Sequence, residues 1–183
     1  MRLHRTLATA LLFALLAAAR AWAGPPLICH AIPIGSERSL PWIDVGSWNG
    51  ADPSYDVARL ERETLALLVP GAPVDLRRET LRRAAIYSAR ESGLGDSILV
   101  ALMARVMNAQ AGTNADPSAW FDAGYFAETL QQAARIYPLL HGSERDAWMI
   151  RSGARNVDGL AWMQTALRLG FKDYGSISTI RPE

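Results

Sequence analysis

Apolar side chains recur at helical spacing from Asp52 to about Gly170. Intervals of three and four residues place such side chains on one face of an α-helix, and no stretch alternates apolar and polar residues as a half-buried strand would. Asp-Pro, Pro-Gly and Ser-Gly pairs divide the pattern into segments. The pattern therefore predicts six helices, which begin near Asp52, Asp75, Asp96, Asp116, Ser143 and Val157.

The helix predicted from Asp116 carries two apolar strips. The main strip runs along the side of Trp120, and a second strip on another side of the helix is formed by Phe121, Tyr125 and Ile136. Either neighbouring helices cover the second strip, or it is an open groove that binds a peptide or a partner helix. The open groove is the interpretation that suggests a function.

The predicted fold class is all-α, with about six helices stacked as antiparallel hairpins in a repeat-like array or a compact bundle. The helix from Asp96 is apolar on nearly every side as far as Met107, so we expect it at the centre of the domain. The tetrapeptide Ala51-Asp52-Pro53-Ser54 returns as Ala115-Asp116-Pro117-Ser118. This repetition records a duplication, or it reflects only that Asp-Pro-Ser is a favourable helix start.

The first 23 residues have the form of a signal peptide. Arg2 and Arg5 precede an apolar run over 7–19, and Ala21-Trp22-Ala23 has the small residues that a signal peptidase reads. The run is too short for a permanent membrane helix, so we expect cleavage after Ala23, no membrane span in the product, and a periplasmic or secreted location. The predicted remainder is an extended arm rich in Pro, Gly and Ser (24–51), a helical domain (52–170) and a C-terminal tail (171–183).

The predicted mature chain is close to neutral. Three of the 19 basic residues belong to the leader, which leaves 16 against 18 acidic residues and a net charge of −2. Nucleic-acid binding requires a surplus of positive charge and is therefore excluded. We expect the densest basic patch to be a solvated face with internal ion pairs, the alternative being a site for an anionic ligand; it comprises Arg77, Arg78, Arg82 and Arg83.

Cys29 and His30 are adjacent and chemically versatile. A single cysteine cannot form an internal disulfide, so it is a small buried side chain that pins the arm, or a thiol that links a dimer or a partner. Cys-His also ends the attachment signature of c-type haem, which leaves haem at Cys29 as an alternative. A thiol dyad would need an imidazole such as that of His141 to reach the sulfur. No metal site is predicted, because these few ligands lack the spacing of one.

Two segments of the chain resemble known kinds of protein. Pro25-Pro26-Leu27-Ile28-Cys29-His30, with Ile34-Gly35 and Ser39-Leu40-Pro41-Trp42, resembles the start of uncharacterised exported bacterial helical proteins, which implies export and helical content but no activity. Trp120 with Gly124 in an alanine-rich helix resembles tetratricopeptide-like repeats, although other positions of that motif are not met. The second resemblance implies stacked helical hairpins.

The expected function is protein or peptide binding in the cell envelope by an exported, non-catalytic helical-repeat protein. The sequence contains no recognisable catalytic set, whereas several aromatic residues, such as Trp42 and Phe121, are expected to be exposed. The expected contact surface combines the second strip of the helix from Asp116 with Trp42 and Trp48 of the arm. The alternative is a thiol- or haem-dependent protein that works through Cys29 and His30.

Overall fold

Helices dominate the part of the chain that the computed structural model describes, which comprises residues 27–44, 48–91, 93–111, 116–141 and 157–172. These residues contain no strand and one isolated antiparallel bridge, between Trp42 and Ala51. The predicted all-α class is confirmed. The leader, the helix expected from Ser143 and most of the tail lie outside the described residues. The elements are η1 (Val57–Arg59), α2 (Leu60–Leu67), α3 (Val74–Tyr87), η2 (Ser88–Arg90), α4 (Leu94–Ala111), α5 (Pro117–His141) and α7 (Gly159–Arg168), where η denotes a 3-10 helix.

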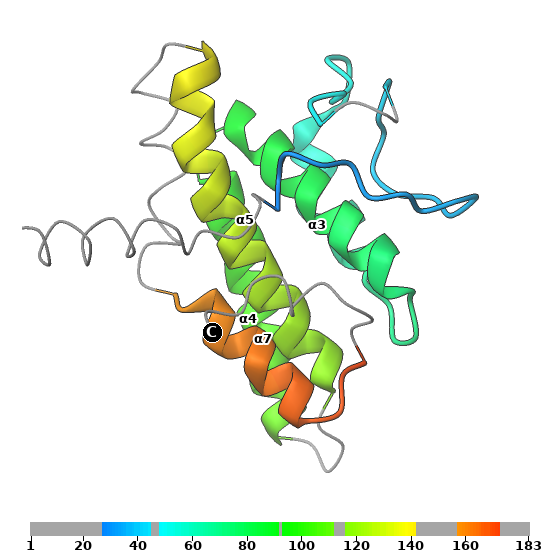
Figure 1. Cartoon of the computed structure of the whole chain (residues 1–183), viewed down its shortest axis with the longest axis vertical. Helices are drawn as coiled ribbons and strands as arrows, with labels where there is room; N and C mark the ends of the chain where they lie inside the picture. Colours follow the sequence, from blue (N-terminus) through cyan, green and yellow to red (C-terminus); the bar gives the residue numbers. More distant parts are fainter. Residues whose placement is uncertain (1–26, 45–47, 92, 112–115, 142–156, 173–183) are drawn as a thin grey trace, which may run out of the picture. The chain divides into compact units, whose positions relative to one another are not determined.

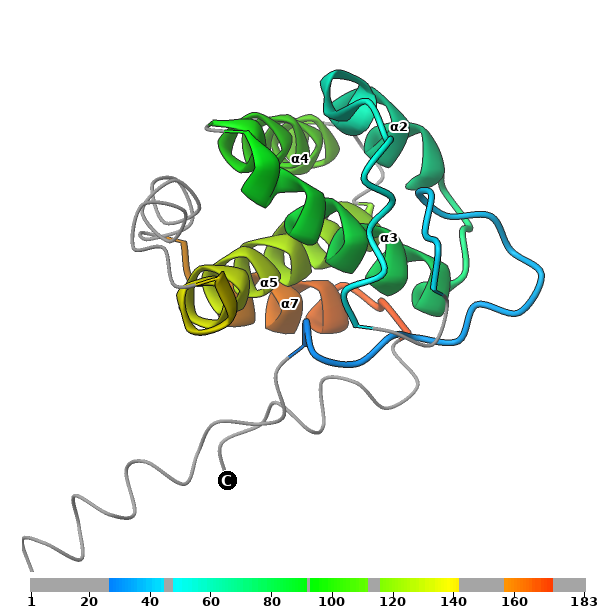
Figure 2. The same cartoon turned by 90° about the horizontal axis from the view of Figure 1, so that it is seen from above.

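The longest described helix, α5, lies at the centre of the helical group (Figure 1). It packs against α3, α4 and α7, while the main contacts of α4 among the described elements are with α5, α2 and η2. In Figure 2, α4 lies at the edge of the described helices. The prediction that the all-apolar α4 would be central is therefore wrong, because α5 carries two apolar strips and is covered on both. None of the described helices combines the length and hydrophobicity that crossing a membrane requires.

The two Asp-Pro-Ser segments form the same turn, yet only the second begins a helix. Asp52 accepts hydrogen bonds from the backbone N–H and the hydroxyl of Ser54, at 2.8 and 2.7 Å. Asp116 accepts the same pair from Ser118, at 3.0 and 2.7 Å, and α5 starts at Pro117. A shared local turn therefore does not by itself indicate a duplicated pair of helices.

The helix predicted from Asp52 starts later, at Val57, where Asp56 caps it by accepting a hydrogen bond from a backbone N–H. The backbone N–H of Asp52 instead donates to the hydroxyl of Tyr87 at 2.9 Å, and its carbonyl accepts from Arg90 at 2.7 Å. These contacts with α3 and η2 hold the segment before Asp56 outside the helix.

The arm, here residues 27–44 and 48–51, contains no helix and runs along α3 (Figure 1). Ile28 and Leu40 are fully buried, and the backbone N–H of Leu27 donates to Gln132 of α5. The arm belongs to the same compact unit as the helices, Leu27–Tyr174. Its apolar anchors are therefore part of the core.

A close backbone contact joins α5 to α7. A Cβ atom on Gly124 would lie 2.5 Å from the carbonyl oxygen of Gly159, so only glycine permits this approach. Asp158 caps α7 by accepting a hydrogen bond from the N–H of Ala161 at 2.9 Å. Gly170 follows the helix with φ +94°, as expected of a residue that ends a helix.

Candidate functional site

The densest polar cluster of the described residues lies between α3 and the arm, and Glu79 is at its centre. This buried carboxylate accepts hydrogen bonds from Arg82 at 2.7 and 2.8 Å, from Arg83 at 2.7 Å, and from the backbone N–H of Ile32 at 3.0 Å. Burial raises the pKa of Glu79, but the hydrogen bonds and the charge of Arg82 outweigh it and hold that pKa below its ordinary value. Glu79 is therefore an anion that compensates two guanidinium groups.

The two guanidinium groups bind the main chain of the arm. Arg82 donates to the carbonyl oxygens of Ile28 at 3.2 Å and Trp48 at 2.8 Å, and Arg83 donates to that of Leu40 at 2.6 Å. Because the arm has no helix or sheet to satisfy these carbonyls, the arginines take over that role.

Aromatic contacts complete the attachment of the arm. Arg82 and Arg83 lie over the ring of Trp42, and their guanidinium carbons are 5.0 and 5.2 Å from the ring centre. The same ring meets that of Tyr87 edge-on, with centres 6.0 Å apart, and the Tyr87 hydroxyl donates to the carbonyl of Pro41 at 2.6 Å. Trp42 is thus engaged by its own chain.

The basic patch of α3 is not the solvated face that the sequence predicts. Arg77, Arg82 and Arg83 are buried, while Arg78 reaches solvent and pairs with Asp75 at 3.1 Å. The expectation of internal ion pairs is confirmed. The expectation of solvation is wrong, because the arm binds Arg82 and Arg83 and because Arg77 pairs with Asp122 of α5. The Nε and Nη2 atoms of Arg82 donate hydrogen bonds to Glu79, and its Nη1 donates to the arm. The cluster therefore holds the fold together rather than binding an anionic ligand.

A second buried ion pair connects α3 to α5. Arg77 Nη1 lies 2.6 Å from Oδ2 of Asp122, and each side chain is 2% exposed. Burial raises the pKa of Asp122 to about 7, against the opposing charges of Arg77 and Arg105. The other carboxylate oxygen, Oδ1, has no hydrogen-bond partner among the described residues. The carboxyl titrates near neutrality, but a substrate has no access to it.

The second strip of α5 is core and not an open groove. Phe121 and Tyr125 are 0% and 1% exposed, and their rings stack with centres 5.6 Å apart. Phe171, which follows α7, stacks on Phe121 with centres 4.4 Å apart. The predicted binding role of Phe121 and Tyr125 is therefore wrong, because α3, α7 and the residues after α7 cover them. Ile136 lies in α5, but its side chain lies outside the described part of the chain.

The arm residues expected to bind a partner or a cofactor differ in exposure. Trp48 is half-buried, and its carbonyl is occupied by Arg82. Cys29 is half-buried and forms no disulfide, and His30 is exposed. The pinning role expected of Cys29 falls to the preceding residue, Ile28. The side chain of His141, the other imidazole of the predicted dyad, lies outside the described residues.

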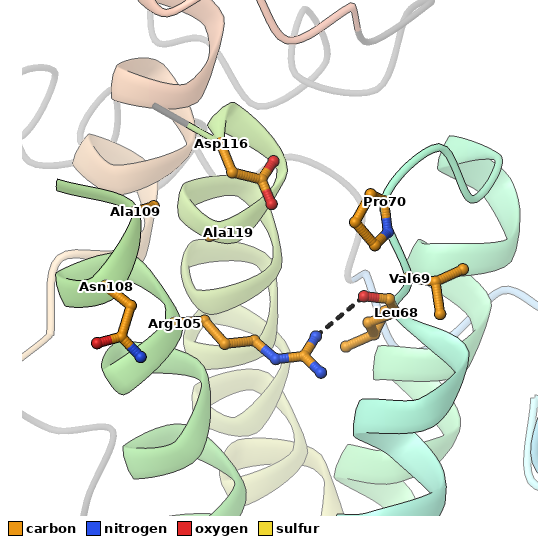
Figure 3. A pocket seen from close by; sticks show the side chains of 8 residues that line it. All are labelled: Leu68, Val69, Pro70, Arg105, Asn108, Ala109, Asp116 and Ala119. Carbon is orange, nitrogen blue, oxygen red and sulfur yellow. Dashed lines mark hydrogen bonds between the residues drawn. The ribbon is translucent and has the colours of Figure 1, made fainter. Parts of the chain in front are cut away.

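An open pocket of about 350 Å³ lies where α2 ends, α4 ends and α5 begins (Figure 3). Arg105 points into it and donates to the carbonyl oxygens of Leu68 at 2.9 Å and Leu65 at 2.7 Å. Asp116 on the opposite side uses Oδ1 to bind Ser118. The guanidinium and one carboxylate oxygen thus serve the ends of helices, which leaves few groups directed at a ligand.

One exposed side of α4 departs from the usual pattern of a surface helix, whose exposed side is polar. Val100, Met103, Ala104 and Met107 are spaced by three, four and seven residues and share one side of the helix. Val100 is 65% exposed and Met107 is 66% exposed; Ala104 is exposed and Met103 half-buried. These four residues, which we call the α4 face, carry no charge. Sequence reasoning missed this surface because it interpreted the lack of a polar side as burial at the centre.

Comparison of the chain with protein-family models, with curated proteins and with solved structures gave no match. The candidate site therefore depends on the geometry of this chain alone.

Proposed function

We propose that the chain is an exported, non-catalytic protein-interaction module whose contact surface is the α4 face. The observation that carries the proposal is the exposure of Val100 and Met107, each about two thirds exposed, beside Met103 and Ala104 on one side of α4. Exposed apolar side chains that lie together on one element favour association with another protein.

The energetics support association. Complete burial of a valine or methionine side chain contributes about 1.5–3 kcal/mol relative to full exposure. Because Val100 and Met107 are about two thirds exposed, covering both would contribute roughly 2–4 kcal/mol before the cost of association. This is enough to stabilise a modest interface, to which Met103 and Ala104 add contact area.

The chemistry of the chain favours a protein partner over a substrate. The α4 face has no polar group that would orient a small molecule, and the predicted mature chain lacks the positive charge that nucleic acid requires. Glu79, Arg82 and Arg83, whose residue types often serve in catalysis, bind the arm. An apolar helix of the partner, laid along α4, fits the face best.

Site-specific photocrosslinking tests the proposal. A photoreactive phenylalanine analogue at Val100 is compared, in cells that produce and export the chain, with the same analogue at Gln164, an exposed position on α7. We expect polypeptide adducts from position 100 and not from position 164. Adducts of equal yield at both positions, or none from position 100, would contradict the proposal. Mass analysis of the product separately tests export, since cleavage after Ala23 leaves a chain that begins at Gly24.

A further inference from the structure

We infer that Asn49-Gly50 is a site of spontaneous modification, where Asn49 deamidates through a succinimide to aspartate and isoaspartate and thereby loosens the attachment of the arm. The site is separate from the α4 face. Gly50 has no side chain to hinder the approach of its backbone nitrogen to the side-chain amide of Asn49. The other asparagines of the sequence, Asn108, Asn114 and Asn156, are followed by alanine, alanine and valine, whose side chains hinder that approach.

The reaction needs water and no other reactant. The backbone nitrogen of Gly50 loses its proton and attacks Cγ of Asn49, a C–N bond forms, and the side-chain nitrogen leaves as ammonia. Water then opens the cyclic imide. Attack at Cγ gives aspartate, whereas attack at the main-chain carbonyl gives isoaspartate, in which the main chain runs through Cβ and Cγ. Because the nitrogen must lose a proton before it attacks, the rate rises with pH.

The fold leaves Asn49 accessible and requires the glycine after it. Asn49 is exposed and lies in a turn, outside the helices. A Cβ atom on Gly50 would lie 2.5 Å from the carbonyl oxygen of Asp44 and 2.6 Å from Nε1 of Trp42. The packing of the arm therefore retains glycine at position 50, and with it the reactive pair.

Isoaspartate at position 49 changes the spacing of the main-chain groups that hold the arm. On one side, the carbonyl of Trp48 accepts a hydrogen bond from Arg82 at 2.8 Å. On the other side, the carbonyl of Gly50 accepts one from the backbone N–H of Ile43 at 2.8 Å. Isoaspartate inserts an additional main-chain carbon between these two carbonyls. Since Gly50 is buried, the added length displaces at least one of them from its partner.

Peptide mapping of the intact, folded chain after incubation in mildly alkaline buffer tests the site. Asn108 is the matched internal control, because it is also exposed but lies in α4 and precedes alanine. We expect Asn49 to convert at least about tenfold faster than Asn108, with isoaspartate among the products and a rate that rises with pH. Equal conversion of the two asparagines, or conversion of Asn49 in the urea-unfolded chain only, would overturn the inference.

Limited proteolysis tests the effect on the arm. The deamidated fraction, collected by ion-exchange chromatography, is compared with the unmodified chain and with freshly purified Asn49→Asp, which carries the new charge without the additional carbon. We expect cleavage within the arm to be at least about threefold faster in the deamidated fraction, and Asn49→Asp to be as protected as the unmodified chain. Equal protection of the deamidated and unmodified chains, or equal loss of protection in Asn49→Asp, would show that the inserted carbon does not loosen the arm.

Discussion

The contact between α5 and α7 allows a quantitative prediction from one methyl group. In Gly124→Ala, the new Cβ would lie 2.5 Å from the carbonyl oxygen of Gly159, 2.9 Å from the backbone nitrogen of Met163 and 3.0 Å from its Cγ. Two of these three atoms belong to the backbone of α7 and cannot rotate away. The methyl group therefore forces α7 to move outward from α5.

Two opposing contributions determine the magnitude. Alanine stabilises a helix interior by about 1 kcal/mol relative to glycine. Overpacking costs about 1–3 kcal/mol, and here the separation of the helices also loosens the packing of Met163 and Ala166, both fully buried. We expect a net loss of about 2 kcal/mol in the free energy of unfolding, which corresponds to a fall of about 4–8 °C in Tm for a chain of this length.

Urea unfolding followed by circular dichroism measures this loss, and the chain supplies a matched control. Gly95 also lies in a helix, but a Cβ there would first meet the flexible end of Leu130 at 3.0 Å, so Gly95→Ala should change stability by less than about 1 kcal/mol. The double variant Gly124→Ala, Gly159→Ala should cost less than the two single changes together, because the first already separates the helices. A Gly124→Ala protein as stable as Gly95→Ala would refute the close contact.

Two further predictions concern the buried charges. Glu79→Gln leaves Arg82 and Arg83 without their anion, so it should lower the free energy of unfolding by about 3–5 kcal/mol and expose the arm to proteolysis. Asp75→Asn, at an exposed position of the same helix, should lower it by less than about 1 kcal/mol. Equal effects of the two variants in urea unfolding would show that the buried network contributes nothing. Because the pKa of Asp122 is raised to about 7 in the folded chain, the folded state binds the proton of this carboxyl more tightly than the unfolded state does. The contribution of Asp122 to stability is therefore full below the pKa of the unfolded chain, near 4, and is lost as the pH rises through 7. The wild-type chain should therefore lose roughly 2–3 kcal/mol more than Asp122→Asn between pH 5 and pH 8, and parallel pH profiles of the two proteins would contradict the shift.

Local signals in the sequence predict the fold class and most helix starts among the described residues. Asp116 followed by proline begins α5, Asp158 lies just before α7, and Gly170 ends it, because capping depends on residues a few positions apart. The predicted start at Asp52 is wrong for the opposite reason. Its backbone is held by Tyr87 and Arg90, which are distant in the sequence.

The candidate surface could not be predicted because burial depends on which elements meet. The arginines of α3 have the sequence pattern of a solvated face, but Arg82 and Arg83 are buried because an arm that lies about fifty residues earlier in the chain supplies carbonyl groups for them. The pattern of α5 leaves open whether Phe121 is covered or exposed, and in the structure Phe171 stacks on it. Conversely, the all-apolar pattern of α4 favours a central place, yet α5 occupies the centre and leaves the α4 face exposed.

Methionine oxidation reports whether the α4 face is open in the isolated chain and covered in the cell, which is the property on which the proposed function depends. Met107 is 66% exposed, and Met163, fully buried between α5 and α7, is the internal control. In dilute purified protein treated with peroxide, we expect Met107 to oxidise at least about tenfold faster than Met163, and in intact producing cells we expect Met107 to be protected. Equal rates for the two methionines in dilute protein would show that the α4 face is not open, and equally fast oxidation of Met107 in cells would show that no partner covers it.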